Sequence, residues 1–356
     1  MGKTERISRL RALIERLDLD GVLVTSSSNV RYISGFTGSE GTCLVTKKEA
    51  MFFTDSRYTI QAGDETEGFE VHTFLEKAPY ISEHIRKLGL TRLGMESVYM
   101  PYGEWRNYSE AFKPIEIAPL QKEIDHLRMI KEPEEIELIR EAIAISEKAF
   151  LKAVAQIKPG AVEKDVALTL EFEQKRSGAS GVPFEIIIAS GYRGALPHGI
   201  ASDKKIEKGE MVVIDFGAVY QGYCSDQTCT LGVGAIDDEA REIYRIVLDA
   251  QRKAIDAAKP GMDVVDLDKT ARDHIEAKGY GKLFGHGLGH GLGLDVHEDP
   301  RISRLGKGVI EKGMIFSIEP GIYIEGRLGI RIEDLVLATD HGVEVLTTLD
   351  KRLTVI

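Results

Sequence analysis

The chain has 356 residues and a formal net charge of -11. This length predicts two domains, and the acidic balance excludes a basic surface for nucleic acid. No apolar run reaches the roughly 18 residues that span a bilayer. The three cysteines form no C-x-x-C pair and favour neither a disulfide framework nor a thiolate zinc site. We therefore expect a soluble cytoplasmic protein with no membrane or nucleic-acid partner.

Short helices and strands alternate in the first third of the chain. Apolar residues at helical spacing in residues 7–17 precede a run at 21–24 that is typical of a buried strand. Further strands are predicted over 42–45, 50–53 and 69–71, and a helix over 81–88. This pattern predicts an α/β domain over residues 1–123.

The second predicted domain, residues 124–356, begins with a long amphipathic helix and contains an internal repeat. Pro133 and the Lys-Pro-Gly at 158–160 are start and stop signals for that helix. The same Lys-Pro-Gly recurs at 259–261, and Ile214-Asp215 recurs as Ile318-Glu319 at a similar offset. Two copies in the same order predict an α+β domain with pseudo-twofold symmetry, whose halves meet at its centre.

The first copy contains a predicted hairpin with two aspartates. A turn centred between Tyr220 and Gln221 would place Asp215 directly opposite Asp226. Facing residues of an antiparallel pair have Cβ atoms about 4.5–5.5 Å apart, and like charges placed so repel each other. A cation between them would remove that repulsion.

The second copy repeats this arrangement with two glutamates. A turn about Gly326 would place Glu319 opposite Glu333, and His290 lies upstream in a glycine-rich run. Four carboxylates and one imidazole suggest a two-metal site, with Mn²⁺ favoured by the oxygen ligands and Co²⁺, Zn²⁺ or Fe²⁺ admitted by the imidazole. Two such ions can activate a shared water, so hydrolysis is the expected reaction.

Simpler readings of these residues exist. Each acid alone could be an exposed turn residue, the glycine-rich run at 284–294 could be a flexible loop, and Arg331 could satisfy one carboxylate pair by a salt bridge. Apolar neighbours on either side of the acids argue against exposure, because an unpaired charge among them is costly. His198 and His297 follow the two Lys-Pro-Gly motifs at similar intervals, which suggests symmetry mates rather than unrelated surface histidines.

The sequence around these residues resembles the pita-bread metallopeptidases, the family of Xaa-Pro dipeptidase (prolidase) and aminopeptidase P. The likeness rests on an ordered Asp, Asp, His, Glu, Glu set in the contexts Ile-Asp-Phe-Gly, Ser-Asp, Gly-His-Gly, Ile-Glu-Pro-Gly and Arg-Ile-Glu-Asp. Residues 29–38 and 54–58 resemble the creatinase-like domain that precedes the catalytic one. The resemblance implies an α/β creatinase-like domain over 1–123 and a pita-bread catalytic domain over 124–356.

The resemblance also implies roles for the five metal ligands. Asp226 and Glu333 would bridge two metal ions, Asp215 would hold one ion, and His290 with Glu319 would hold the other. Glu319 would also relay a proton towards the leaving nitrogen.

Five further residues take implied roles around the substrate. His198 and His297 would stabilise the scissile carbonyl and the developing oxyanion, and His286 would line the pocket for the proline ring. Arg331 would orient a ligand from behind. Arg301 would pair with the free carboxylate of a dipeptide, although it could also be a surface arginine.

The expected function is therefore hydrolysis of the Xaa-Pro bond in short proline-containing peptides by a metal-bridging hydroxide, with dipeptides as the leading substrate. The alternative is an aminopeptidase P, which releases the N-terminal residue of longer Xaa-Pro peptides. A metal-free creatinase-like enzyme or a non-catalytic binding module would have lost the ligands that this chain keeps. The resemblance further implies a homodimer.

Overall fold

The computed structural model describes residues 3–356, which form two compact units that divide between Arg128 and Met129. The predicted boundary lies earlier, between residues 123 and 124. The short 3-10 helix η1 (Asp125–Arg128) joins the first unit because Asp125 accepts a hydrogen bond from Asn29 and the Leu127 carbonyl accepts one from Tyr32. Within the described residues, no helix has the length and apolarity needed to cross a membrane.

The N-terminal unit is built on one six-stranded sheet in the order β4-β3-β2-β1-β5-β6. Neighbours β1, β2 and β3 are antiparallel, whereas the outer pairs are parallel. Its strands are β1 (Gly21–Val24), β2 (Thr42–Thr46), β3 (Ala50–Thr54), β4 (Glu70–Thr73), β5 (Arg92–Glu96) and β6 (Glu116–Leu120). Its helices are α1 (Lys3–Arg16), α2 (Ser27–Ser34), α3 (Thr59–Glu65), α4 (Lys77–Lys87) and α5 (Tyr102–Ala111). The four predicted strands and two predicted helices are confirmed, and β5, β6, α2, α3 and α5 are additions.

The C-terminal unit has two sheets, ordered β19-β11-β8-β7 and β13-β12-β14-β17-β18, and two small hairpins, β9–β10 and β15–β16. Its helices are α6 (Pro133–Val154), α7 (Glu163–Arg176), α8 (Asp238–Ala257) and α9 (Val264–Ala277), with 3-10 helices η2 (Gly191–Ala195) and η3 (Gly281–Leu283). The first sheet and its hairpin comprise β7 (Ile187–Ser190), β8 (Met211–Phe216), β9 (Val219–Tyr220), β10 (Tyr223–Cys224), β11 (Gln227–Gly232) and β19 (Thr354–Val355). The second sheet and its hairpin comprise β12 (Gly289–Gly291), β13 (Glu298–Ile302), β14 (Ile315–Ile318), β15 (Gly321–Ile324), β16 (Leu328–Arg331), β17 (Asp334–Ala338) and β18 (Val343–Val345).

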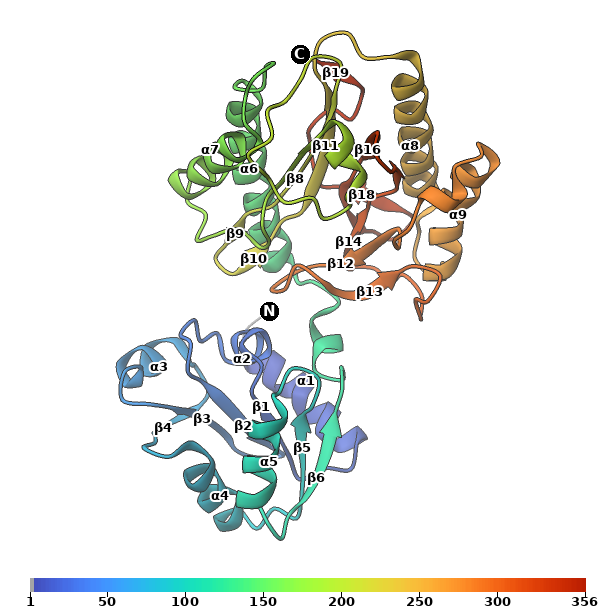
Figure 1. The fold of residues 1–356 in the computed structure, drawn as a ribbon. Coiled ribbons are helices and arrows are strands. Elements are labelled where there is room, and N and C mark those ends of the chain that lie inside the picture. The colour runs from blue at the N-terminus through green and yellow to red at the C-terminus, as the bar shows by residue number, and fades with distance from the viewer. Residues whose placement is uncertain (1–2) are drawn as a thin grey trace. The chain divides into compact units, whose positions relative to one another are not determined.

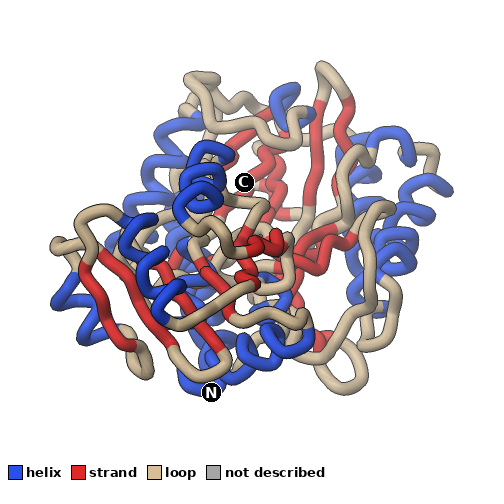
Figure 2. The backbone as a smooth tube through the Cα atoms, turned by 90° about the horizontal axis from the view of Figure 1, so that it is seen from below, coloured by secondary structure: helices blue, strands red, loops and turns tan. Residues whose placement is uncertain are grey.

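The internal repeat is visible in this unit. Helices α7 and α9 each follow a Lys-Pro-Gly motif, Asp215 lies near the end of β8, and Glu319 directly follows β14. Figure 1 shows α6 and α7 on one side and α8 and α9 on the other, with the strands between them, and Figure 2 shows the same separation of helices from strands. Each helix pair buries its apolar face on its own sheet, with Leu170 and Ile214 in one core and Leu267 and Phe316 in the other. The centre between the halves is left to polar residues.

Candidate metal centre

The first acidic hairpin turns one residue later than predicted. Tyr220 pairs with Tyr223, so the turn centres on Gln221 and Gly222, which both have positive φ angles (44° and 82°). Glycine adopts this backbone at little cost, and paired positive φ angles are typical of tight hairpins. Asp215 therefore lies opposite Thr228, and the predicted direct pairing of Asp215 with Asp226 is wrong. Because Asp226 and Thr228 are two residues apart, Asp226 is a diagonal neighbour of Asp215 on the same face.

The second acidic hairpin has the predicted register. Ile318 pairs with Asp334 and Gly321 with Arg331, so the same register places Glu319 across from Glu333. Pro320 lies between β14 and β15 on the same arm of the hairpin, and it interrupts the pairing of this arm with the opposite arm because proline has no backbone N–H to donate. The predicted centre of this hairpin at Gly326 is confirmed.

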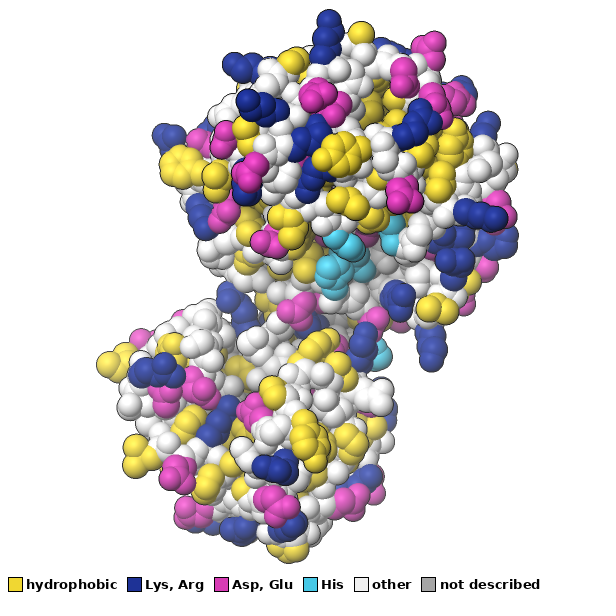
Figure 3. Space-filling view, viewed as in Figure 1, with side chains coloured by type: hydrophobic (Ala, Val, Ile, Leu, Met, Phe, Trp, Pro, Cys, Tyr) yellow, Lys and Arg dark blue, Asp and Glu magenta, His cyan; other side chains and the backbone are white. Residues whose placement is uncertain are grey.

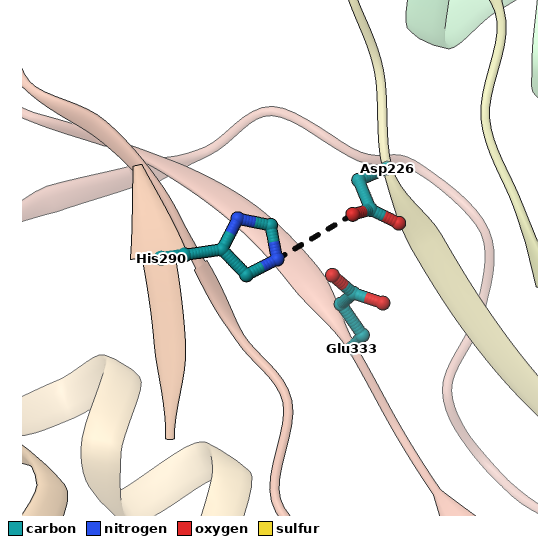
Figure 4. A group of neighbouring side chains, drawn as sticks. All are labelled: Asp226, His290 and Glu333. Atoms are coloured by element: carbon teal, nitrogen blue, oxygen red, sulfur yellow. Dashed lines mark ion pairs between the residues drawn. The ribbon is translucent and has the colours of Figure 1, made fainter. Parts of the chain in front are cut away.

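Ligands from both halves converge at one point of the C-terminal unit. The ligand atoms of Asp226, His290 and Glu333 all lie within 4.8 Å of one another, and Figure 4 shows the three side chains pointing together. His290 Nε2 lies 3.6 Å from Asp226 Oδ2 and 3.4 Å from Glu319 Oε1. Its Nδ1 donates to the Gly291 carbonyl (3.1 Å), which leaves the Nε2 lone pair for a ligand.

Two buried carboxylate oxygens in this cluster have no hydrogen-bond partner among the described residues. They are Asp215 Oδ1 and Glu333 Oε1. The second oxygen of each is held, because Arg331 donates to Asp215 Oδ2 (2.6 Å) and Thr228 donates to Glu333 Oε2 (2.8 Å). Unpartnered buried anionic oxygens are costly unless a cation is bound. The residues present therefore fit a site for divalent metal ions.

The electrostatics of the cluster agree with this fit. Burial raises the pKa of Asp226 well above its usual value, and the charges of Glu333, Asp215 and Glu319 raise it further. Burial likewise raises the pKa of Glu333, with Glu319 and Asp215 adding to the effect, and burial raises the pKa of Glu319. Burial lowers the pKa of His290, so its imidazole is neutral near pH 7. A neutral imidazole among repelling carboxylates is a donor set for metal cations.

Two of the predicted substrate histidines lie at the surface beside this cluster. His198 and His297 are exposed, and Figure 3 shows histidine side chains (cyan) gathered on one face of the C-terminal unit. The His297 ring lies 4.3 Å from that of His290, between ring centroids. Loss of hydration, followed by the neighbouring His290 and His198, lowers the pKa of His297 to about 4. The predicted pair of histidines thus lie close to each other, and His297 lies against His290.

The remaining predicted residues occupy different surroundings. His286 is half-buried and its Nε2 shares a hydrogen bond with the Tyr323 hydroxyl (2.8 Å). Arg331 is buried, so a surface charge is excluded, and it also donates to Tyr323 (3.0 Å). Arg301 is exposed on β13, directly opposite His290 on β12. Facing residues of an antiparallel pair project from the same side of the sheet, so Arg301 stands beside the cluster.

Sequence reasoning missed three polar residues that hold the ligands. Thr228 binds Glu333, Ser317 donates to Glu319 Oε1 (3.2 Å), and Tyr323 joins His286 to Arg331. Burial raises the pKa of Tyr323 to about 12, so its hydroxyl keeps its proton. The period of two along a strand could have found Thr228 and Ser317, because each lies two residues from a ligand and on its face. No signal in the sequence marks Tyr323.

Together the two units and the cluster define a metallopeptidase with a creatinase-like N-terminal domain and a pita-bread catalytic domain. The chain belongs to metallopeptidase family M24, whose model matches residues 137–340, and the creatinase/prolidase N-terminal domain matches residues 6–130. Members of this family use divalent metal ions, in agreement with the ligand cluster.

Full-length relatives are found among curated proteins and solved structures. A protein named Xaa-Pro dipeptidase from Pyrococcus horikoshii is 40% identical, covering 98% of both chains. The structure of an Xaa-Pro dipeptidase from Bacillus anthracis is 41% identical, covers both chains completely and has a TM-score of 0.97. That of an X-Pro aminopeptidase from Thermotoga maritima is 42% identical over 96% of this chain and 99% of the other, with a TM-score of 0.90.

The raised pKa values predict that metal stabilises the protein more as the pH rises. Burial raises the pKa values of Asp226, Glu319 and Glu333 in the metal-free folded state, so between the unfolded and folded pKa values the folded protein binds more protons than the unfolded chain. Metal-free stability therefore falls as the pH rises through their folded pKa values, whereas metal binding needs the carboxylates deprotonated. We expect the gain in Tm on adding Mn²⁺ to be larger at pH 8 than at pH 5, measured by calorimetry. An equal gain at both pH values would contradict the prediction.

Proposed function

We propose that the protein is a dinuclear, Mn²⁺-dependent hydrolase that cleaves the Xaa-Pro bond of dipeptides. The observation that carries the proposal is the convergence of Asp226, His290 and Glu333, drawn from both halves of the repeat, with exposed Arg301 beside them. Relatives named Xaa-Pro dipeptidase that cover almost the whole chain support the substrate class. The preponderance of carboxylate ligands supports Mn²⁺ over softer ions.

The proposal assigns the ligands as follows. Asp226 and Glu333 would be shared by both ions, Asp215 would hold one ion, and His290 with Glu319 would hold the other. Bound divalent ions supply Lewis acidity and lower the pKa of a coordinated water towards neutrality. Burial raises the pKa of Glu319, which favours uptake of a proton by this carboxyl, and the carboxyl would then pass the proton to the leaving proline nitrogen.

Residues at the exposed side of the cluster act on the peptide. His198 and His297 donate hydrogen bonds to the scissile carbonyl and stabilise the negative charge that develops on its oxygen. His286 is fixed by Tyr323 and lines the pocket for the proline ring. A tertiary Xaa-Pro amide has no N–H, so recognition must rest on the carbonyl, the ring and the charged ends.

Arg301 is proposed to bind the free carboxylate of the dipeptide. A hydrogen bond to a charged group contributes about 1.5–3 kcal/mol, which corresponds to about a 10- to 100-fold change in affinity. We expect Arg301→Ala to raise KM for Met-Pro by this factor with little change in kcat. Exposed Arg304 on the same segment provides the control, because Arg304→Ala should leave KM unchanged. Equal kinetics of Arg301→Ala and the wild type would remove Arg301 from the site.

An aminopeptidase P activity is the second candidate. The similarity to the X-Pro aminopeptidase from Thermotoga maritima, at the same level as that to the dipeptidases, favours it. Hydrolysis of Met-Pro and Arg-Pro-Pro by the Mn²⁺-loaded protein distinguishes the two. Turnover of the dipeptide alone supports the proposal, and cleavage of the tripeptide alone would replace it with the aminopeptidase.

A homodimer in the cytoplasm completes the proposal. The three cysteines are buried, and no disulfide is found among the described residues, which fits a reducing compartment. Light scattering at micromolar concentration should give twice the mass of the 39.4 kDa chain, and a monomer alone would contradict the expected assembly.

A further inference from the structure

The two proposed bridging ligands directly precede strands that belong to different sheets. Asp226 directly precedes β11 and Glu333 directly precedes β17, and no ladder joins those strands. On the metal side they are linked through Thr228, whose carbonyl accepts from the Glu333 N–H (3.2 Å) and whose hydroxyl donates to the Glu333 carboxylate (2.8 Å). The spacing of Asp226 and Glu333 therefore depends on one backbone hydrogen bond and on side-chain contacts between the two halves.

A buried lysine joins the same two strands from behind. The ammonium of Lys351 lies 3.4 Å from Asp334 Oδ1 on β17 and 3.6 Å from Cys229 Sγ on β11. With the Gln227 amide oriented to satisfy its neighbours, Nζ donates to its oxygen at 2.7 Å. The side chains of Lys351 and Asp334 are each only 8% exposed. This cation is thus held by both halves of the domain.

Strand alternation places Lys351 on the reverse side from the metal ligands. Successive side chains of a strand point to opposite faces. Gln227 and Cys229 alternate with Asp226 and Thr228, which face the cluster, and Asp334 directly follows Glu333. The residues that contact Lys351 are therefore the immediate chain neighbours of the residues that line the metal side.

The segment that carries Lys351 is itself anchored. The Thr348 and Leu349 N–H groups donate to Glu147 on α6 (2.6 and 3.2 Å), and the Lys351 carbonyl accepts from the Tyr244 hydroxyl (2.9 Å). This segment lies beyond residue 340, where the match to the family model ends. Because this backbone is anchored independently of β11 and β17, Lys351 can restrict the relative movement of these two strands.

From this geometry we propose that Lys351 is a positioning residue, which clamps β11 to β17 and so sets the separation of Asp226 and Glu333 for two metal ions. The inference rests on the ligand assignment of the proposed function. Removing a distant cation could instead strengthen metal binding by charge alone. However, the double variant Lys351→Met with Asp334→Asn removes one positive and one negative charge, so it leaves the net charge behind the site the same. The loss of position is then the effect that remains.

The test is Mn²⁺ binding to metal-free Lys351→Met by calorimetry at 25 °C, with Lys204→Met as matched control. Lys204 is also ion-paired and mostly covered (14% side-chain exposure) in the same unit, and it contacts Glu210 and Ser190 rather than β11 or β17. Losing a residue that orients metal ligands typically weakens metal affinity by about 10- to 100-fold. We expect that loss for Lys351→Met and wild-type affinity for Lys204→Met. We also expect the electron paramagnetic resonance spectrum of two coupled Mn²⁺ ions to weaken in Lys351→Met alone.

Each outcome has one meaning. If the wild type binds no Mn²⁺, the proposed function is wrong. If the wild type binds two ions and Lys351→Met binds them equally or more tightly, only the proposed role of Lys351 is wrong. If the single variant fails to fold, Lys351→Met with Asp334→Asn removes both buried charges, a change that proteins often tolerate. That double variant lacks the clamp too, so it should show the same weakened affinity, and wild-type affinity there would overturn the inference.

Discussion

Glu333→Gln is expected to reduce kcat/KM on Met-Pro by more than about 1000-fold, because a metal-activated water has a pKa near 7 rather than 15.7. Glu333 is 1% exposed and its Oε1 has no partner among the described residues. Glutamine has nearly the same shape and can still accept the hydrogen bond from Thr228. The fold should therefore survive while the anionic bridge is lost.

Metal content decides what the loss of activity means. Elemental analysis after dialysis should show two ions per chain in the wild type and fewer in Glu333→Gln. Exposed Asp340, which pairs with Lys312, provides a control acid, and Asp340→Asn should retain both metal and rate. A Glu333→Gln variant with two ions and full activity would show that this carboxylate is not a ligand.

The two acidic hairpins show which parts of the metal site can be predicted from the sequence. The ladder from Ile318–Asp334 through Gly321–Arg331 was predictable, because Gly326 marks the turn and the apolar alternation fixes the face. The predicted turn of the first acidic hairpin was wrong by one residue. Gln221 adopts a positive φ there, and glutamine is not a residue type that predicts this conformation. The ligands still share a face, because a turn shifted by one residue moves the pairing by two.

Contacts between distant segments mark the limit of prediction. Lys351 contacts partners that are brought together only by the packing of the two halves, whereas Tyr323 contacts His286 and Arg331 within the second half, and neither residue lies in a motif. Local propensity and period describe the strands that carry them. They do not describe which side chains meet across a domain with two separate sheets.

Arg331→Met is expected to cause the largest loss of stability in the metal-free protein. Arg331 is 3% exposed and donates to Asp215, Thr228 and the Pro197 carbonyl. Removing one partner of a buried ion pair costs about 3–5 kcal/mol, because the other charge is left uncompensated. For a domain of this size the Tm should fall by roughly 10 °C, measured by calorimetry on metal-free protein.

Exposed Arg327 on the same hairpin is the control. It pairs with Glu239 in solvent, so Arg327→Met should leave the Tm unchanged. Arg331→Lys should lie between Arg331→Met and the wild type, because an ammonium keeps the charge but cannot reproduce the planar fork that reaches several acceptors. An Arg331→Met variant as stable as Arg327→Met would mean that Asp215 needs no cation.

Saturating Mn²⁺ separates the two sources of positive charge around Asp215. Its Oδ2 is held by Arg331, whereas its Oδ1 has no partner among the described residues. If Asp215 Oδ1 is a metal ligand, the positive charge of the bound ions replaces that of Arg331. The Asp215 carboxylate is then stabilised against its negatively charged neighbours even in Arg331→Met. The Tm deficit of the variant should then shrink on adding Mn²⁺. A deficit that stays constant would place Asp215 in a structural ion pair only, because a carboxylate that binds the metal must respond to its charge.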